Sequence, residues 1–344
     1  MNPMLAPLLL SFTFAAPPAY RLEIEPAKEI EALLTQEFHA PEFHPTEWVF
    51  AAPRPPELPN QRDIKAEMIV VGHKIEHSIP HHALIIARVP VKEAHPMKVE
   101  VRYQALLRTV KLIPLAAGAK HPEIPPLNEE ERREWTKPTE DFAYEAKGFQ
   151  EWLTHHKLRR EAKEGEIEFA RRLFVFIATH FKYHLAEKMD RKPAAVCHAG
   201  KSDCGGISTL YVSALRANGI PARTLPGRMA ESAKKGAKID GVAFYQTHVK
   251  TDFHALGVGW VPVDPTGGMS QGEKVDDFYF GQDRADFLAF SLPAEHQFEI
   301  MGLGKQKVSG MQGVAYWALG KGKLNVKDSE DWKVEARLLK PEKK

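Results

Sequence analysis

Cysteine is scarce in this sequence, and its scarcity limits the class of fold. The 344 residues contain only two cysteines, Cys197 and Cys204. Two cysteines cannot form a disulfide framework, and neither a CxxC pair nor a zinc-type Cys/His spacing is present. A disulfide-stapled domain and a cysteine-based zinc site are therefore excluded, and the cysteine count does not indicate a compartment.

An excess of charge of one sign is also lacking. Lys and Arg number 47 and Asp and Glu number 45, which gives a net charge of +2 with both signs interspersed. Such a chain has no broad electrostatic field that would attract nucleic acid or an anionic membrane surface. We therefore expect no nucleic-acid partner.

The amino terminus has no apolar run long enough to span a bilayer. Its apolar stretch covers residues 4–16, so we expect no transmembrane helix there. The stretch suits the apolar region of a secretion signal, although the usual early Lys or Arg is missing. Residues 1–18 are thus either a signal peptide, which would make the protein periplasmic or secreted, or a first strand in a protein that stays in the cytoplasm.

What the sequence does have is enough apolar content, 43% of its residues, to bury a core in two or three domains. Residues 19–115 show short period-two stretches separated by proline-rich turns, which predicts an antiparallel β-sandwich. Residues 116–150 are rich in proline and charge, which is typical of a linker with some helix. From residue 151 the pattern becomes helical. We expect an α+β protein with a second domain over residues 151–300 and a carboxy-terminal extension over residues 301–344.

Two stretches of the second domain predict helices. One apolar helical face is formed by Ile167, Ala170, Phe174, Ile177 and Phe181. The other stretch begins at Cys204, with Ser202 or Asp203 as N-cap, Gly219 just past the end, and apolar residues at Ile207, Leu210, Tyr211, Ala214 and Leu215.

The place of Cys204 in the first helical turn has a chemical consequence. Unsatisfied backbone N–H groups and the positive end of the helix dipole both favour a thiolate over a thiol. Gly205 and Gly206 keep side chains away from an approaching substrate carbonyl. A cysteine at a helix start can also be structural, so this position alone does not establish a nucleophile.

A second stretch supplies the partners of a nucleophile. Residues 242–249 and the sequence WVPVDPT, which begins at Trp260, read as two strands joined by the turn ALGVG. A hairpin of this kind would bring His248 and Asp264 together. A cysteine, a histidine and a carboxylate in this arrangement are the parts of a nucleophile, a base and an orienting group.

At these residues the sequence resembles the transglutaminase-like superfamily, over about residues 165–295. The matching segments are DCG from Asp203 to Gly205, RANGIPAR from Arg216 to Arg223, His248 with Asp252 at the acidic position of HxWxE, and GWVPVDPT from Gly259 to Thr266. The sequence departs from the usual pattern at Ser202, Lys250 and His254, where glycine and two aromatic residues are common. The later FYFGQDRADFLAFS also resembles the family's continuation.

The resemblance implies a papain-like core of helices on an antiparallel sheet within residues 151–300, and it implies that Cys204, His248 and Asp264 form a catalytic triad. The implied chemistry is acyl transfer through a thioester, with the Cys204 amide N–H as oxyanion donor and His198 or Tyr183 as a second donor. A protein or peptide substrate is implied, and no cofactor.

Water as acceptor would make the protein a protease or amidase, which we favour, and a lysine amine would make it a crosslinking transglutaminase. A non-catalytic binding or scaffold module with the same core is the remaining alternative, in which Cys204 would be an ordinary thiol. The oligomeric state does not follow from the sequence.

The remaining conspicuous residues are given structural interpretations. Cys197 is expected to be a free loop cysteine rather than a regulatory disulfide partner of Cys204. Arg223 is expected to form a fold-supporting ion pair, and Trp260 to shield the His248–Asp264 pair from water. No metal site is expected, because no acidic calcium loop is present and a histidine cluster lacks helical ligand spacing; the cluster comprises His73, His77, His81 and His82.

Overall fold

The amino-terminal part of the chain forms two antiparallel β-sheets. A computed structural model describes residues 20–70, 73–79, 82–92, 95–116, 123–272, 274–292, 296–308 and 310–339. The larger sheet has the order β14 (Gln282–Arg284), β6 (Met97–Pro114), β1 (Tyr20–His39) and β19 (Lys327–Leu338), with β3 (Gln61–Ile69) also paired to β6. The smaller has the order β18 (Ala315–Gly322), β2 (Phe43–Arg54), β5 (His82–Pro90) and β4 (His73–Ile79). Large aromatic side chains such as Trp48, Phe50, Tyr103 and Trp332 are buried in the core that these strands share.

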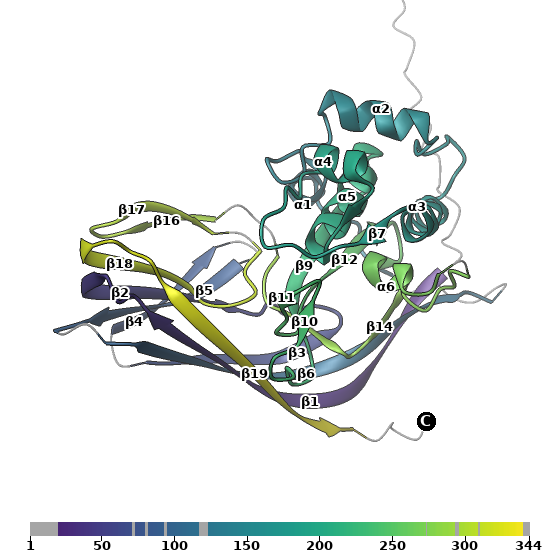
Figure 1. Cartoon of the computed structure of the whole chain (residues 1–344). Helices are drawn as coiled ribbons and strands as arrows, with labels where there is room; N and C mark the ends of the chain where they lie inside the picture. Colours follow the sequence, from purple (N-terminus) through teal and green to yellow (C-terminus); the bar gives the residue numbers. More distant parts are fainter. Residues whose placement is uncertain are drawn as a thin grey trace, which may run out of the picture.

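The carboxy-terminal residues return to these amino-terminal sheets. Strand β19 pairs with β1 along twelve residue pairs, and β18 pairs with β2. A hairpin of β16 (His296–Ile300) and β17 (Gly304–Val308) packs on the β18–β2–β5 sheet through Phe298 and Ile300. Figure 1 shows these last strands, in yellow-green and yellow, lying with the purple and blue strands from the beginning of the chain. The region that the sequence indicates as an extension is thus built into the first domain.

The second domain is a four-stranded antiparallel sheet with helices on one face. Its strand order is β13 (Gly259–Val263), β12 (Thr247–Ala255), β9 (Ala222–Met229) and β15 (Phe287–Ala289). Around it lie α1 (Glu129–Thr136), α2 (Lys147–His155), α3 (Glu166–His180), α4 (Pro193–Ala199), α5 (Cys204–Ala217) and α6 (Pro265–Met269). Two short pairs, β7 (Lys182–Tyr183) with β8 (Lys201–Ser202) and β10 (Lys238–Ile239) with β11 (Val242–Ala243), complete it. In Figure 1 the helices gather on the side of this sheet away from the long strands. The predicted α+β class is confirmed.

Helix α5 begins where the sequence predicts. Asp203 is its N-cap and accepts a hydrogen bond from the Gly206 amide at 3.0 Å, while Gly219 follows its end with a φ of 74°. The predicted apolar residues of this helix are fully buried against β12 and α3. Helix α3 likewise buries the predicted face, and Phe181 follows its last residue.

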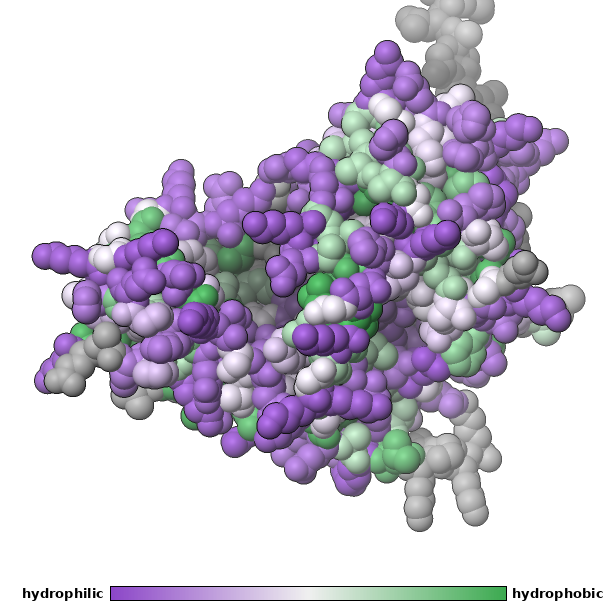
Figure 2. All heavy atoms as spheres, viewed as in Figure 1, coloured by the Kyte–Doolittle hydropathy of each residue, from purple (hydrophilic) through white to green (hydrophobic). Residues whose placement is uncertain are grey.

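The face of the molecule seen in Figure 2 is mostly polar. Figure 2 shows hydrophilic side chains over most of this face, with apolar side chains where the face is hollowed between the left-hand sheets and the helices. In the described ranges, no helix is long and apolar enough to cross a membrane.

Candidate active site

Three elements bring the predicted triad residues to one end of the core sheet. Cys204 is the first residue of α5, His248 lies on β12, and Asp264 directly follows β13. Strand β12 begins at Thr247, later than the predicted start at residue 242, because residues 242–243 pair with β10 instead. The hairpin of β12 and β13 places His248 Nε2 2.8 Å from Asp264 Oδ2. The predicted approach of these two residues is therefore observed.

Asp264 is fixed by hydrogen bonds to both of its carboxylate oxygens. Oδ1 accepts from the Thr266 hydroxyl at 3.0 Å and from the Gly267 amide at 2.9 Å, so that Asp264 also caps α6. Burial alone would raise the pKa of this carboxyl, but His248, Lys250 and the Gly267 N–H together hold the pKa well below its usual range. Asp264 is thus a carboxylate throughout the neutral pH range.

His248 is correspondingly biased toward the imidazolium form. Burial opposes the charged ring, yet the Asp264 carboxylate and, after it, the Cys204 sulfur raise the pKa of His248 from 6.5 to about 10. Since Nε2 is used by Asp264, the other ring nitrogen, Nδ1, remains for Cys204. The Phe287 ring lies edge-on to the imidazole, with ring centroids 6.1 Å apart.

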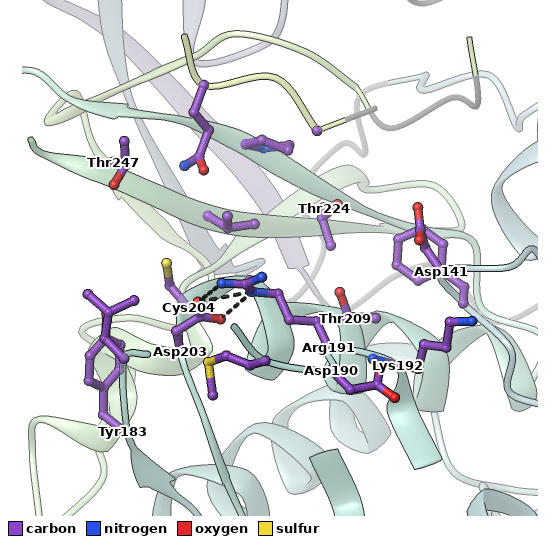
Figure 3. A pocket seen from close by; sticks show the side chains of 18 of the residues that line it. Asp141, Tyr183, Asp190, Arg191, Lys192, Asp203, Cys204, Thr209, Thr224 and Thr247 are labelled. Carbon is purple, nitrogen blue, oxygen red and sulfur yellow. Dashed lines mark hydrogen bonds and ion pairs between the residues drawn. The ribbon is translucent and has the colours of Figure 1, made fainter. Parts of the chain in front are cut away.

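The charge of Asp203, next to Cys204, is balanced by Arg191, which no sequence motif singles out. Asp203 is buried, and Arg191 donates to its two oxygens at 2.9 and 3.0 Å from Nε. Figure 3 shows the Arg191 guanidinium reaching Asp203 directly beside Cys204. The pair neutralises a carboxylate that would otherwise repel a thiolate. In the sequence, Arg191 is only a basic residue two positions before the first residue of α4.

Of the two side chains expected as oxyanion donors, only Tyr183 lies near Cys204. Strand β7, which carries Tyr183, pairs in parallel with β8 just before Cys204. Partial burial, followed by the nearby Cys204 and Asp203, raises the pKa of the Tyr183 phenol, so the hydroxyl keeps its proton. His198 is exposed near the end of α4 and is not among the residues that line the cavity at Cys204.

Two cavities meet at this site. One, of about 540 Å³, is lined by Cys204 and extends to Asp141 and Lys192; Figure 3 shows Tyr183 at its Cys204 end and Asp141 at the opposite end. The other, of about 510 Å³, is lined by His248 and by Phe181, Ile239 and Met269 among others. Tyr183 and Phe244 line both cavities. The sulfur and the imidazole therefore lie between two adjoining hollows.

The two glycines after Cys204 differ in their roles. Gly205 lines the cavity, and a Cβ there would lie 3.2 Å from the Arg191 side chain. A Cβ on Gly206 would instead lie 2.0 Å from the buried Ser202 hydroxyl. The expectation that Gly206 clears a path for substrate is wrong, since this glycine allows α5 to pack on β8.

Arg223 forms the ion pair that was expected of it. Its guanidinium donates to both oxygens of the buried Asp252 at 2.8 and 2.9 Å and lies 3.8 Å from the centre of the Trp260 ring. The Trp260 ring also packs against Trp135 and His254. Asp252, at the acidic position of the motif, thus supports the sheet by pairing with Arg223. Trp260, which was expected to shield His248 and Asp264, packs on Arg223, and the ring that lies edge-on to His248 is that of Phe287.

Lys250, which stands where an aromatic residue is usual, is buried in an ionic cluster. Its ammonium lies 2.6 Å from Asp286 and 3.2 Å from Asp283, and 5.1 Å from the centre of the Phe287 ring. Asp283 lies on β14 and Asp286 directly precedes β15, so the departure at Lys250 is compensated by carboxylates from later elements.

Cys197 is not among the residues that line either cavity. Cys197 is free, as expected, but it lies in α4 rather than a loop, and burial raises the pKa of its thiol. His81 and the side chains of the other histidines in the cluster, His73, His77 and His82, fall outside the described part of the structure. Within that part, no group of three or more His, Cys, Asp or Glu side chains could hold a metal ion.

Comparison with known proteins gives a family match to part of the second domain and a solved structure of similar fold. Residues 154–265 match the model of the Transglutaminase-like superfamily. A proposed cysteine protease from Cytophaga hutchinsonii has a similar structure, with a TM-score of 0.59 over 94% of each chain at 9% identity. A protein of Haemophilus influenzae, itself uncharacterized, is 25% identical over 159 residues, which are 39% of this chain and 42% of that protein. The chain thus covers less than half of that relative's length.

Proposed function

We propose, because residues 154–265 of this chain are a transglutaminase-like superfamily core, that the protein is a cysteine-dependent acyl-transfer enzyme that hydrolyses peptide or amide bonds. The observation that carries this proposal is the His248–Asp264 hydrogen bond of 2.8 Å at the end of the sheet where α5 begins with Cys204. A histidine held by a carboxylate beside a cysteine is the arrangement that activates a thiol nucleophile.

The first half of the reaction forms a thioester. The Cys204 thiolate attacks the amide carbonyl, and the oxyanion is stabilised by the Cys204 backbone N–H and the Tyr183 hydroxyl. The carbon–nitrogen bond then breaks, and the His248 imidazolium gives its Nδ1 proton to the leaving amine. Asp264 keeps the ring oriented and stabilises its positive charge throughout.

The second half releases the acyl group. A water molecule replaces the amine, His248 accepts a proton from it, and the resulting hydroxide equivalent attacks the thioester carbonyl. Collapse of this intermediate gives a carboxylic acid and returns the Cys204 thiolate with the His248 imidazolium. No cofactor takes part in these steps.

The two adjoining cavities favour an extended substrate. Because His248 protonates the leaving amine, we assign the His248-side cavity to the leaving group and the Cys204-side cavity to the acyl portion. A polypeptide segment crossing between Tyr183 and Phe244 would occupy both. The description of the similar Cytophaga hutchinsonii protein as a proposed cysteine protease agrees with this choice.

The test is the rate at which iodoacetamide labels Cys204 as a function of pH, read by peptide mass spectrometry, with Cys197 as internal control. We expect fast labelling that extends well below pH 8 and is lost in His248→Ala. An ordinary thiol has a pKa of about 8.5. If Cys204 labels at the rate of such a thiol and the rate is unchanged in His248→Ala, the proposed enzyme activity is refuted and a non-catalytic binding module remains.

The acceptor is tested separately. Incubation of the protein with a mixture of peptides, with and without a fluorescent alkylamine, should give cleaved peptides that are absent with Cys204→Ala. Predominant incorporation of the amine instead of cleavage would identify a crosslinking transglutaminase.

A further inference from the structure

The wall of the Cys204 cavity includes residues that lie more than a hundred positions later in the chain. Gly310 and Gln312 line this cavity together with Cys204 and Thr247. They precede β18, in the region that returns to the first domain. The cavity is therefore completed by a segment outside the core residues that match the family model.

Gln312 contacts the strand that carries the histidine. Its Nε2 donates to the His248 carbonyl oxygen at 2.8 Å and to the Gly227 carbonyl oxygen at 3.1 Å. Gly227 and His248 are directly paired residues of β9 and β12. One side-chain amide thus joins both strands at the residue whose imidazole faces Asp264.

Gln312 is itself held in place by a buried arginine. Arg228, which is 1% exposed, donates from Nε to the Gln312 carbonyl oxygen at 2.7 Å and from Nη1 to the Tyr245 carbonyl oxygen at 2.8 Å. Its guanidinium also forms an ion pair of 2.7 Å with Glu330 of β19. The same arginine therefore fixes the Gln312 backbone and the chain that leads into β12.

A glutamine of the first domain, Gln36, extends this network to β1. Gln36 of β1 donates from Nε2 to Glu330 at 2.9 Å, and its Oε1 accepts from the Val314 amide at 2.6 Å. The chain that follows Gln312 is thus tied to β1 at Val314, and Gln36 in turn contacts Glu330 of β19. These hydrogen bonds and the Arg228–Glu330 ion pair restrain residues 312 and 314, because a shift of one member would break the contacts of its neighbours.

We propose that Gln312 is a positioning residue for His248, and that residues 310–314 are a wall of the active site supplied by the carboxy-terminal part of the chain. The inference rests on the proposed function, since His248 must act on Cys204 for its position to matter. In metal sites, removal of a group that orients a histidine ligand through a hydrogen bond lowers activity by roughly 10- to 100-fold. Gln312 bonds the backbone of His248 rather than its ring, so we expect an effect at the lower end of this range.

The test compares Gln312→Met with a matched variant, Gln306→Met. Both substitutions keep side-chain length and remove an amide donor; Gln306 donates to the Leu303 carbonyl at 2.8 Å within the β16–β17 hairpin. The readout is the pH profile of Cys204 labelling by iodoacetamide. We expect Gln312→Met to slow labelling at pH 6 by about 10-fold and to move the profile to higher pH, while Gln306→Met leaves it unchanged. Equal profiles for the wild type and Gln312→Met would overturn the proposal.

A second measurement separates this proposal from the proposed function. The His248 imidazole is titrated by nitrogen NMR in the wild type and in both variants, with thermal unfolding as a check of folding. A lower titration midpoint in Gln312→Met alone supports positioning, and an unchanged midpoint overturns it. If Cys204 labels equally in the wild type and His248→Ala, the proposed enzyme fails, and the NMR titration still decides whether Gln312 sets the environment of His248.

Discussion

Replacement of Asp264 by asparagine tests the proposed mechanism at its orienting group. Asp264 Oδ1 accepts from Thr266 and Gly267, and Oδ2 faces His248 Nε2. In Asp264→Asn the amide oxygen is held by the same two donors, so the amide NH₂ faces the imidazole. Nε2 must then accept a hydrogen bond, and the ring proton moves to Nδ1, the nitrogen that should receive the proton of Cys204.

The size of the effect follows from the charge state of His248. Its pKa of about 10, against an ordinary 6.5, corresponds to roughly 5 kcal/mol of preference for the imidazolium. Without Asp264 the burial that opposes the charge remains and only the Cys204 sulfur still favours it, so we expect the imidazole to be largely neutral at pH 6. A thiol without a cationic partner, with a pKa of about 8.5, is only roughly 0.3% thiolate at pH 6. Allowing for the lower nucleophilicity of a stabilised thiolate, we expect labelling of Cys204 at pH 6 to fall by roughly 10- to 100-fold.

The assay is iodoacetamide labelling between pH 5 and pH 9, with Asp240→Asn as control. Asp240 also pairs with a histidine, His184, at 3.2 Å, but both side chains are exposed. The control should therefore label like the wild type. Labelling of Asp264→Asn that matches the wild type at pH 6 would show that the imidazolium does not hold the thiolate, and the mechanism would be wrong.

Three predictions concern stability. The raised pKa of His248 means that its stabilisation is complete below pH 6.5 and is lost as the pH rises through about 10. Between pH 7 and pH 10.5 the wild type should therefore lose up to roughly 4 kcal/mol more unfolding free energy in urea than His248→Gln. Arg223→Met should cost about 3–5 kcal/mol, because it leaves a buried carboxylate unpaired, whereas Arg171→Met, which breaks an exposed pair, should cost about 1 kcal/mol or less. Gly206→Ala should cost about 1–3 kcal/mol through crowding, and Gly148→Ala, with open space at its Cβ, should stabilise α2 by up to about 1 kcal/mol.

Each of these has a contradicting result. Parallel urea curves for the wild type and His248→Gln across the alkaline range would mean that the histidine is not charged in the folded protein. An equal loss of unfolding free energy in Arg223→Met and Arg171→Met would mean that burial does not make the Arg223–Asp252 pair more costly to break than an exposed pair. Equal melting temperatures for the two alanine variants would mean that α5 can shift away from β8 without cost.

Local sequence signals were sufficient for the elements of the site. The N-cap at Asp203 and the apolar spacing after it located the start of α5, because capping and helical periodicity act over a few residues. The hairpin around residues 255–259 brought His248 and Asp264 together, because a short turn leaves adjacent strands little choice but to pair. The start of β12 was misplaced, since the pairing of residues 242–243 with β10 depends on a partner that periodicity does not identify.

Groups supplied by distant segments could not be predicted in the same way. Arg191 gives no periodic signal, and its effect on Cys204 arises only because α4 and α5 bring it to Asp203. The same holds for Lys250, whose two carboxylate partners lie more than thirty residues later in the chain. Charged side chains of this kind look like ordinary surface residues until the fold buries them.

The sequence by itself determined the α+β class, the helix that begins at Cys204, and the hairpin that pairs His248 with Asp264, because each depends on interactions between near neighbours in the chain. The tertiary structure decided which side chains surround them. The carboxy-terminal strands joined the first domain, Tyr183 rather than His198 came to lie at Cys204, and Gln312, itself held by Arg228, came to donate to the His248 carbonyl oxygen. Long-range strand pairing and buried polar contacts of this kind depend on the packing of the whole chain.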